Sequence, residues 1–458
     1  MKTPLHVIIL AAGQGSRMKS SLPKVLHAIA GKPMLHHVID TARELDAAGI
    51  HVVIGHGADK VRSTTADDDI QWAMQSEQLG TGHAVAQALP AVPDDAHILV
   101  LYGDVPLIRT ETLSSLVSTV SAEQMALLTV ELDDPQGYGR IVRSAKGIEA
   151  IIEQKDASAE QLLIKEANTG ILAATARHLK SWLPALSSEN AQGEYYLTDI
   201  IAMAAGEGTG IAAAQPASVA EVQGVNNRQQ LAGLERAYQR AQADALMTAG
   251  VTLADPDRLD VRGSLHSEGD VFVDVGVVFE GNVRLNAGVH IGPYCVIRDS
   301  EIAANTRIES HSIVEGASIG PGCTVGPFAR LRPGTVLAEG AKVGNFVETK
   351  KATIGPGSKV NHLSYIGDTR MGSRVNIGAG TITCNYDGAN KFETVLGDDV
   401  FVGSNSALVA PVEVGAGATI GAGSTITRAV ADGELAIGRG KQRNVEGWKR
   451  PQKKSSTD

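Results

Sequence analysis

The sequence predicts two dissimilar domains: an α/β domain with a Rossmann-like, mostly parallel sheet, followed by an all-β domain that is a parallel β-helix. Three observations lead to this prediction. The first half alternates apolar runs with helical patterns, the second half repeats an aliphatic residue at every sixth position, and one helical segment separates them. At 458 residues the chain is also too long for one ordinary hydrophobic core.

The alternation in the first half extends to about residue 226. Apolar runs predict strands at Val7–Leu10, His51–Ile54, Ile98–Leu101 and Ala126–Val130. Helical patterns occupy Met34–Leu45 and Thr81–Ala88. Such alternation is typical of a sheet with helices on both faces, in which ligands bind beyond the carboxyl ends of the strands. The loops after Leu10 and Leu101 therefore form the candidate site.

The second half follows a predicted connecting helix at 228–247, which ends at Gly250. A spacing of six then places in register Val271, Val277, Val283, Val289 and Cys295; Ile302, Ile308 and Val314; Ile319, Val325, Leu331, Leu337 and Val343; Ile354, Val360 and Ile366; and Leu396, Val402, Leu408, Val414, Ile420 and Ile426. Such a repeat predicts a parallel β-helix with these residues inward. A β-sandwich would instead alternate with a period of two.

The repeat is interrupted between Thr381 and Val395, where the segment TCNYDGANKFETV inserts polar residues. A solenoid accommodates such an insertion as a loop on one face, and these loops often carry function. We expect the domains to be 1–227, a linker helix at 228–250, the β-helix at 251–437 and a basic tail at 438–458.

Charge and cysteine content restrict the partners. The net charge of −10 argues against general nucleic-acid binding, which requires a basic surface, but permits small anionic substrates. Cys295, Cys323 and Cys384 have neither metal-ligand spacing nor a disulfide pattern, which indicates a reduced, cytoplasmic protein. The apolar run Val7–Ala12 is a short strand rather than a signal peptide, and we expect no membrane insertion.

The first candidate site begins with Gly13-Gln14-Gly15-Ser16-Arg17, directly after the first strand. Glycines let backbone amides approach a phosphate, and Arg17 and Lys24 add full positive charges. The dinucleotide-binding pattern does not fit, because its third glycine would fall at Met18. The segment predicts a phosphate site.

Asp104 ends the second loop, in Tyr102-Gly103-Asp104. A carboxylate here would hold Mg²⁺, whose hard charge prefers oxygen ligands and bridges phosphates. The alternative is a turn residue beside Gly103.

The second candidate site is built around His362, because an imidazole titrates close to neutral pH and serves as a general base. Isolated histidines are usually bystanders, but Glu348, Lys350, Lys351 and Tyr365 are close in sequence. Inward positions of the repeat cannot accommodate charge, so this cluster is expected to project outward.

Over residues 5–440 these motifs resemble the bacterial bifunctional enzymes that are N-acetylglucosamine-1-phosphate uridyltransferases and glucosamine-1-phosphate acetyltransferases. The resemblance implies that the second domain acetylates glucosamine-1-phosphate with acetyl-CoA. The first domain then transfers UMP from UTP to N-acetylglucosamine-1-phosphate and releases pyrophosphate. It also implies Mg²⁺, a left-handed β-helix with coils of about 18 residues, and a homotrimer.

For the first site, the resemblance assigns Arg17 and Lys24 to catalysis and Asp104 and Asn226 to the metal. It assigns UTP and the sugar nucleotide to Leu10, Ala11, Ala12, Gly13, Lys24, Gln75, Gly80, Thr81, Tyr102, Gly103, Asp104, Gly139, Glu153, Asn168 and Asn226. The amide of Gln75 is expected both to accept from uracil N3–H and to donate to O4. Gln14 and Ser16 depart from the Lys and Thr that are frequent in the family.

For the second site, the resemblance makes His362 the base, with Glu348 as its orienting partner. It assigns the sugar phosphate to Arg332, Lys350, Tyr365, Asn376 and Lys391. It assigns acetyl-CoA to Ala379, Asn385, Tyr386, Ser404, Ala422 and Arg439, with Asn385 and Tyr386 also lining the acceptor site. The coil length would bring Arg332, Lys350 and a position near Asp368 together.

Two alternatives give the β-helix no chemistry. In one, the chain is a single-activity hexose-1-phosphate nucleotidylyltransferase with a regulatory or trimerising β-helix. In the other, the β-helix is a structural scaffold only. A scaffold has no use for a base and phosphate-binding cations on one face, so the cluster around His362 favours the bifunctional enzyme.

Overall fold

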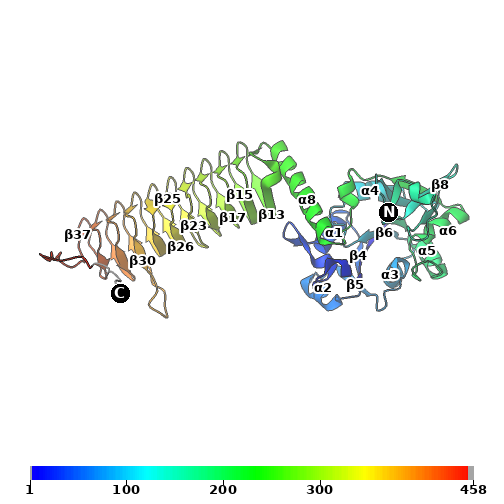
Figure 1. The fold of residues 1–458 in the computed structure, drawn as a ribbon, viewed down its shortest axis with the longest axis horizontal. Helices are drawn as coiled ribbons and strands as arrows, with labels where there is room; N and C mark the ends of the chain where they lie inside the picture. Colours follow the sequence, from blue (N-terminus) through cyan, green and yellow to red (C-terminus); the bar gives the residue numbers. More distant parts are fainter. Residues whose placement is uncertain (1–2, 66, 452–458) are drawn as a thin grey trace, which may run out of the picture. The chain divides into compact units, whose positions relative to one another are not determined.

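The computed structural model describes residues 3–65 and 67–451, and the chain divides into two compact units between Ala241 and Gln242 (Figure 1). This division falls within helix α8 (Arg228–Thr248), beyond the sequence-based boundary after residue 227. In α8, Leu234 packs in the first unit, whereas Ala243 belongs to the core of the second. Residues 452–458 of the expected tail lie outside the described residues.

The first unit is built on a sheet with the order β11-β7-β10-β6-β1-β4-β5, to which β8 and β9 are attached. Its strands are β1 (Leu5–Ala11), β4 (Gly49–Ile54), β5 (Ile70–Met74), β6 (His97–Tyr102), β7 (Gln124–Glu131), β8 (Arg140–Ser144), β9 (Gly147–Ile152), β10 (Glu166–Thr175) and β11 (Gly210–Ala214). β10 runs antiparallel to both β6 and β7, so the sheet is mostly but not wholly parallel. A small ribbon joins β2 (Ala28–Ile29) and β3 (Lys32–Pro33).

Helices cover both faces of this sheet. They are α1 (Met34–Glu44), α2 (Ala58–Thr64), α3 (Thr81–Ala88), α4 (Thr110–Ser118), α5 (Ala176–Trp182), α6 (Asp199–Glu207) and α7 (Val219–Val222). Alternate residues of β1 enter different cores: Val7 and Ile9 pack with α1 and α4, whereas Ile8 and Leu10 pack with α3, α5 and α6. The predicted strands and helices of this half are confirmed.

The register of β1 places the two predicted loops side by side. β1 lies between β4 and β6, and Leu10 pairs with Tyr102 in the parallel β1–β6 ladder. Gly103 N donates to Leu10 O at 2.9 Å, so the chain leaves both strands at the same edge of the sheet. The residues that follow β1 and β6 therefore face one region.

The second unit is a left-handed parallel β-helix. One face is the ladder of β12 (Thr252–Leu253), β14 (Phe272–Val273), β16 (His290–Ile291), β19 (Arg307–Ile308), β22 (Thr324–Val325), β25 (Lys342–Asn345), β27 (Lys359–His362), β29 (Asn376–Ile377), β32 (Phe401–Val402), β35 (Thr419–Ile420) and β37 (Leu435–Ala436). A second, larger sheet forms the rest of each coil. It contains β13 (Leu259–Ser267), β15 (Val277–Leu285), β17 (Val296–Arg298), β18 (Glu301–Ile302), β20 (Ile313–Glu315), β21 (Ser318–Ile319), β23 (Arg330–Leu331), β24 (Val336–Leu337), β26 (Glu348–Ile354), β28 (Tyr365–Met371), β30 (Ile382–Cys384), β31 (Thr394–Leu396), β33 (Ala407–Val409), β34 (Val412–Val414) and β36 (Thr425–Ile426).

The six-residue period identifies the core of this unit. Every aliphatic or cysteine residue placed in register by the sequence is at most 6% exposed and belongs to one continuous hydrophobic cluster. Parallel pairing stacks Ser318 on Val336 and Lys342 on Lys359, so each coil repeats the one before it. The predicted β-helix is confirmed.

The predicted insertion is a loop between β30 and β31, which projects from the coils in Figure 1. Thr369 pairs across it with Thr394, so the coil resumes its register after the loop. No helix in the described residues has the length and apolar character needed to cross a membrane.

Candidate active sites

A pocket of about 490 Å³ lies beyond the carboxyl ends of β1 and β6. It is lined by Leu10, Ala11, Ala12, Gly13, Gln14, Lys24, Val25, Gln75, Gln78, Gly80, Thr81, Ala84, Tyr102, Asp104 and Glu194. Most of the side chains and glycines proposed for the nucleotide are therefore in one place. Gly103 is not among the lining residues but packs against two of them: a Cβ there would come 3.3 Å from Val25 and 3.4 Å from Ala11.

Two cations lie at the glycine-rich loop: Lys24 lines the pocket, and Arg17, which is not among the lining residues, reaches Asn226 beside it. Gly15 has a φ of +63°, and a Cβ there would lie 2.7 Å from Cβ of Lys24, so glycine lets the two segments touch. Arg17 Nη2 donates to Asn226 Oδ1 at 2.8 Å. Lys24 Nζ donates to the same oxygen at 3.3 Å and also to the Asp104 carboxylate.

The backbone holds these groups together. Val225 N donates to Asp104 O at 3.0 Å, and Asn226 N donates to Gln230 Oε1 at 2.7 Å. Residues from three distant parts of the sequence thus meet at one point. Two positively charged side chains lie there beside the side-chain oxygens of Asp104 and Asn226. This is an environment suited to a polyphosphate.

The Asp104–Asn226 pair fits Mg²⁺. In the described part of the chain, no three His, Cys, Asp or Glu residues form a metal-binding group. However, the Asp104 carboxylate and the Asn226 carbonyl both contact a single positive charge, the Lys24 ammonium. Mg²⁺ is commonly held in this way, by one or two protein oxygens together with substrate phosphates.

The residues proposed for the sugar form a second group in the same unit. A Cβ on Gly139 would lie 3.5 Å from Glu153 Oε1 and 3.6 Å from Asn168 Cβ, and Asn168 N donates to Gly139 O at 2.9 Å. Burial raises the pKa of Glu153, and the Thr198 hydroxyl donates to its carboxylate at 3.2 Å. These polar groups are arranged to hydrogen-bond a neutral, hydroxyl-rich ligand.

Gln75 differs from the sequence-based expectation. Its Nε2 donates to Gly80 O and contacts His83 Nδ1, both at 3.1 Å, whereas its carbonyl oxygen has no partner among the described residues. With His83 as the Nε2–H tautomer, both amide hydrogens are used, and the amide offers the pocket an acceptor but no free donor for uracil O4.

The second site lies on the coils formed by β25 to β28. His362 is exposed at the end of β27 and pairs in register with Asn345 of β25. Its Nδ1 is 2.8 Å from Asn345 Oδ1. Glu348, expected to orient His362, instead accepts from Arg332 Nη1 at 2.8 Å. Sequence reasoning missed Asn345, although its place one coil before His362 was a usable signal.

Arg332, Lys350 and Lys391 form a group of three positive charges near β27, the strand that ends at His362. The nearby ammonium of Lys391 and, more weakly, Arg332 lower the pKa of Lys350, whereas Asp368 opposes this effect. The strand register agrees with the expected proximity of these groups: Leu331 pairs with Thr349 and Lys350 with Gly367, which places Arg332, Lys350 and Asp368 on successive coils. The inserted loop supplies Lys391, and its Asn385 amide donates to the Asp368 carboxylate. Such a concentration of positive charge is suited to a phosphate.

Four of the residues proposed for acetyl-CoA follow one corner of the coils: Ala379, Ser404, Ala422 and Arg439. Asn405 N donates to Ala379 O at 2.8 Å, Gly423 N donates to Ser404 O at 2.8 Å, and Arg439 Nη1 donates to Ala422 O at 2.5 Å. Gly380 N donates to His362 O at 3.3 Å, which connects this column to the imidazole. Tyr386 is exposed on the loop, and Asn376 is on β29, in the coil after Lys359.

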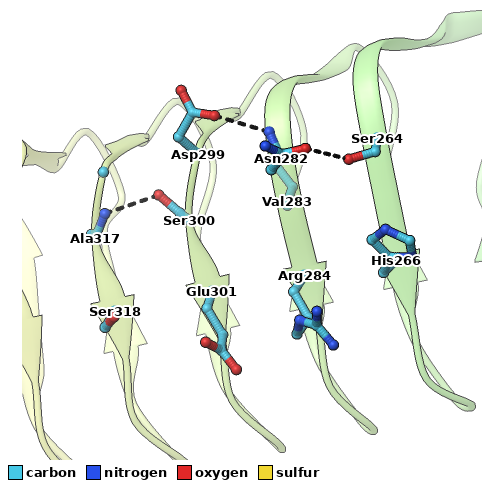
Figure 2. Close-up of a pocket in the computed structure, with 11 residues that line it drawn as sticks. Ser264, His266, Asn282, Val283, Arg284, Asp299, Ser300, Glu301, Ala317 and Ser318 are labelled. Carbon is cyan, nitrogen blue, oxygen red and sulfur yellow. Dashed lines mark hydrogen bonds between the residues drawn. The ribbon is translucent and has the colours of Figure 1, made fainter.

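A separate groove of about 510 Å³ on the first coils contains none of the predicted site residues (Figure 2). Its polar side chains bond to one another: Ser264 Oγ donates to Asn282 Oδ1 at 2.6 Å, and Asn282 N donates to Asp299 at 2.9 Å. These bonds link neighbouring coils.

The first unit and its pocket define a nucleotidyltransferase, and the second unit has the fold of a hexapeptide-repeat acyltransferase. Three family models match the chain: the MobA-like NTP transferase domain at residues 7–189, the GMPPB C-terminal domain at 261–361, and six bacterial transferase hexapeptide repeats at 393–428.

Curated relatives match nearly the whole chain. The Bifunctional protein GlmU of Marinobacter nauticus is 65% identical over 98% of this chain and 100% of its own length. Those of Cellvibrio japonicus and Pseudomonas entomophila are 60% and 59% identical, each over 98% of this chain and 100% and 99% of their lengths. The chain belongs to the GlmU family of bifunctional enzymes. It is an N-acetylglucosamine-1-phosphate uridyltransferase and glucosamine-1-phosphate acetyltransferase of UDP-N-acetylglucosamine synthesis. This excludes the alternatives in which the β-helix carries no chemistry.

Proposed function

We propose that the pocket beyond β1 and β6 catalyses uridylyl transfer, with Arg17 and Lys24 on the phosphates of UTP. The observation that supports this proposal most directly is the convergence of Arg17, Lys24, Asp104 and Asn226. Gln75, Gly80 and Thr81 contact uracil, and Gly139, Glu153 and Asn168 contact the acetylated sugar. The other nucleotide-binding residues are Leu10, Ala11, Ala12, Gly13, Tyr102 and Gly103.

This reaction needs no general base. The phosphate of N-acetylglucosamine-1-phosphate is already anionic, and it attacks the α-phosphorus of UTP while the bond to pyrophosphate breaks. What the protein supplies is alignment and positive charge on the leaving group. Amides of the glycine-rich loop, Arg17 and Lys24 meet that need. Mg²⁺ held by Asp104 and Asn226 would neutralise further phosphate charge.

We assign acetyl transfer to the surface around His362. The neutral imidazole takes a proton from the amino group of glucosamine-1-phosphate as the nitrogen attacks the thioester carbonyl. The C–S bond then breaks, and the imidazolium returns that proton to the departing sulfur of CoA. Arg332, Lys350 and Lys391 hold the sugar phosphate, with Tyr365 and Asn376 beside them. The corner column from Ala379 to Arg439 binds acetyl-CoA, and Asn385 and Tyr386 close the acceptor site.

We further propose that the enzyme is a cytoplasmic homotrimer. Along one corner of the coils, the rings of Tyr294, His311, Phe328 and Phe346 stack with centroids 4.9–5.4 Å apart, and the exposed Leu363 continues this column. Phe346 is 56% and Leu363 61% exposed. We call these five residues the aromatic column. Burial against a neighbouring copy would stabilise it and place that copy beside His362.

Two assays on the purified full-length chain test these assignments. We expect acetyl-CoA-dependent thiol release with glucosamine-1-phosphate, and UTP-dependent pyrophosphate release with N-acetylglucosamine-1-phosphate. Pyrophosphate release should stop when Mg²⁺ is chelated and return when it is added back, whereas thiol release should continue. Pyrophosphate release that is insensitive to chelation would overturn the metal assignment.

A further inference from the structure

We propose that His83 determines specificity for the nucleotide base, because it fixes which end of the Gln75 amide faces the pocket. The inference rests on the proposed function of that pocket and deepens it. His83 itself does not line the pocket, so it acts through Gln75 as a positioning residue.

The Gln75 amide is held from two sides. The residue follows β5, is 3% exposed, and is anchored by its backbone N, which donates to Ile54 O at 2.8 Å. Its Nε2 is 3.1 Å from Gly80 O and 3.1 Å from His83 Nδ1. An amide nitrogen has two hydrogens. With the imidazole hydrogen on Nε2, one of them goes to Gly80 O and the other to the lone pair of His83 Nδ1.

The reverse orientation of the amide is unfavourable for the same reason. If the amide turned over, its oxygen would face Gly80 O, which is repulsive, and it could accept from His83 only if the imidazole moved its hydrogen from Nε2 to Nδ1. Without His83, only the contact with Gly80 O would oppose this reversal. His83 therefore adds the second constraint that keeps the oxygen toward the pocket.

The start of α3 keeps His83 in position. Gly82 N donates to Tyr195 O at 2.9 Å, and Leu197 N donates to Thr81 Oγ1 at 3.1 Å. These contacts fix the first turn of α3 against a separate segment of the chain. The imidazole is thus aimed at Gln75 by the fold itself.

This arrangement distinguishes uracil from cytosine at a single atom, N3 of the base. A fixed acceptor matches the N3–H of uracil, whereas N3 of cytosine carries a lone pair that would repel it. A free amide would turn over and donate to cytosine N3 instead. With His83 present, turnover of CTP relative to UTP should therefore be lower than in an enzyme whose Gln75 amide can turn over freely.

The test compares kcat/KM for UTP and CTP in the full-length enzyme and in His83→Ala. We expect the UTP-to-CTP ratio to fall about fivefold to tenfold, the effect of one hydrogen bond, mostly through KM, with kcat for UTP within about threefold of wild type. His83→Asn, which restores an acceptor, should recover part of the ratio. His36→Ala is the control, because this histidine bonds Thr65 at 2.7 Å and does not line the pocket.

An unchanged ratio in His83→Ala would overturn the inference. If that variant does not fold, His83→Leu makes the same comparison, since it fills the space without an acceptor. Gln75→Ala distinguishes a failure of the inference about His83 from a failure of the proposed contact between Gln75 and uracil. If it lowers the ratio and His83→Ala does not, only the inference fails; if neither changes the ratio, uracil does not contact Gln75 and that part of the proposed function fails.

Discussion

The chemistry of His362 depends on which of its ring nitrogens carries the proton. Asn345 Oδ1 can only accept, so the 2.8 Å contact favours a hydrogen on Nδ1 and leaves Nε2 as the basic nitrogen. Asn345 lies one coil below on β25 and fixes the ring from behind. We therefore assign Asn345 a positioning role in acetyl transfer.

At this scale, His362→Ala should lower kcat for acetyl transfer by roughly 10²- to 10⁴-fold, as loss of a general base does. Asn345→Ala should cost about tenfold, because the other tautomer becomes populated. Nitrogen-15 NMR of labelled histidine should detect that change of tautomer in Asn345→Ala. A wild-type acetylation rate in His362→Ala would refute the role of His362 as the base. An unchanged tautomer of His362 in Asn345→Ala would refute the positioning role of Asn345.

At the scale of elements, α8 completes the first unit before it enters the second. Leu234 is 1% exposed and packs with Met18, Ile29 and Met34, and Glu235 Oε2 accepts from Ala30 N at 2.7 Å. The glycine-rich loop continues into Met18, so this contact supports the site itself. A fragment that ends near residue 230 would lack it.

We therefore expect residues 1–248 to fold and to retain uridylyl transfer, whereas residues 1–230 should be less stable by about 2–5 kcal/mol, comparable to removing a buried leucine. Urea unfolding of both fragments, followed by the pyrophosphate assay, provides the comparison. Leu234→Ala in the longer fragment should reproduce much of the loss. A folded 1–248 fragment that does not turn over UTP would show that the second unit completes the first site.

The elements were predictable because each has its own local period. The strands of the first unit are short apolar runs, and the inward residues of the β-helix recur every six positions. The partners of His362 and Gln75 were less accessible, because they depend on stacking and on side-chain orientation. Glu348 is nearer to His362 in sequence than Asn345, but β26 lies past the corner from β27, whereas β25 is its direct neighbour. His83 was missed because its effect is exerted through another side chain.

At the scale of the whole molecule, the proposed trimer would connect assembly to acetyl transfer through the aromatic column. Its last member, Leu363, directly follows His362, so a copy packed on the column would lie beside the base. The first site has no residue in the second unit. Assembly should therefore matter to one activity and not to the other.

Phe346→Asp should dissociate the proposed trimer, because a buried unpaired charge is strongly unfavourable at an interface, and acetyl transfer should fall with it. Pyrophosphate release should be spared. Ser318→Asp, on β21 and away from the column, is the matched control. Sedimentation combined with the two assays decides the matter: a Phe346→Asp monomer with full acetyltransferase activity would refute the proposal that the site is shared between copies.

The central claim is that one chain carries two chemically independent sites. It is tested most directly by measuring both activities in full-length Lys24→Ala and His362→Ala. Lys24→Ala should lose pyrophosphate release by about 10²-fold or more, as expected for a cation that stabilises the transition state, and keep thiol release. His362→Ala should do the reverse. If either variant, correctly folded and trimeric, lost both activities together, independence of the two sites would be contradicted.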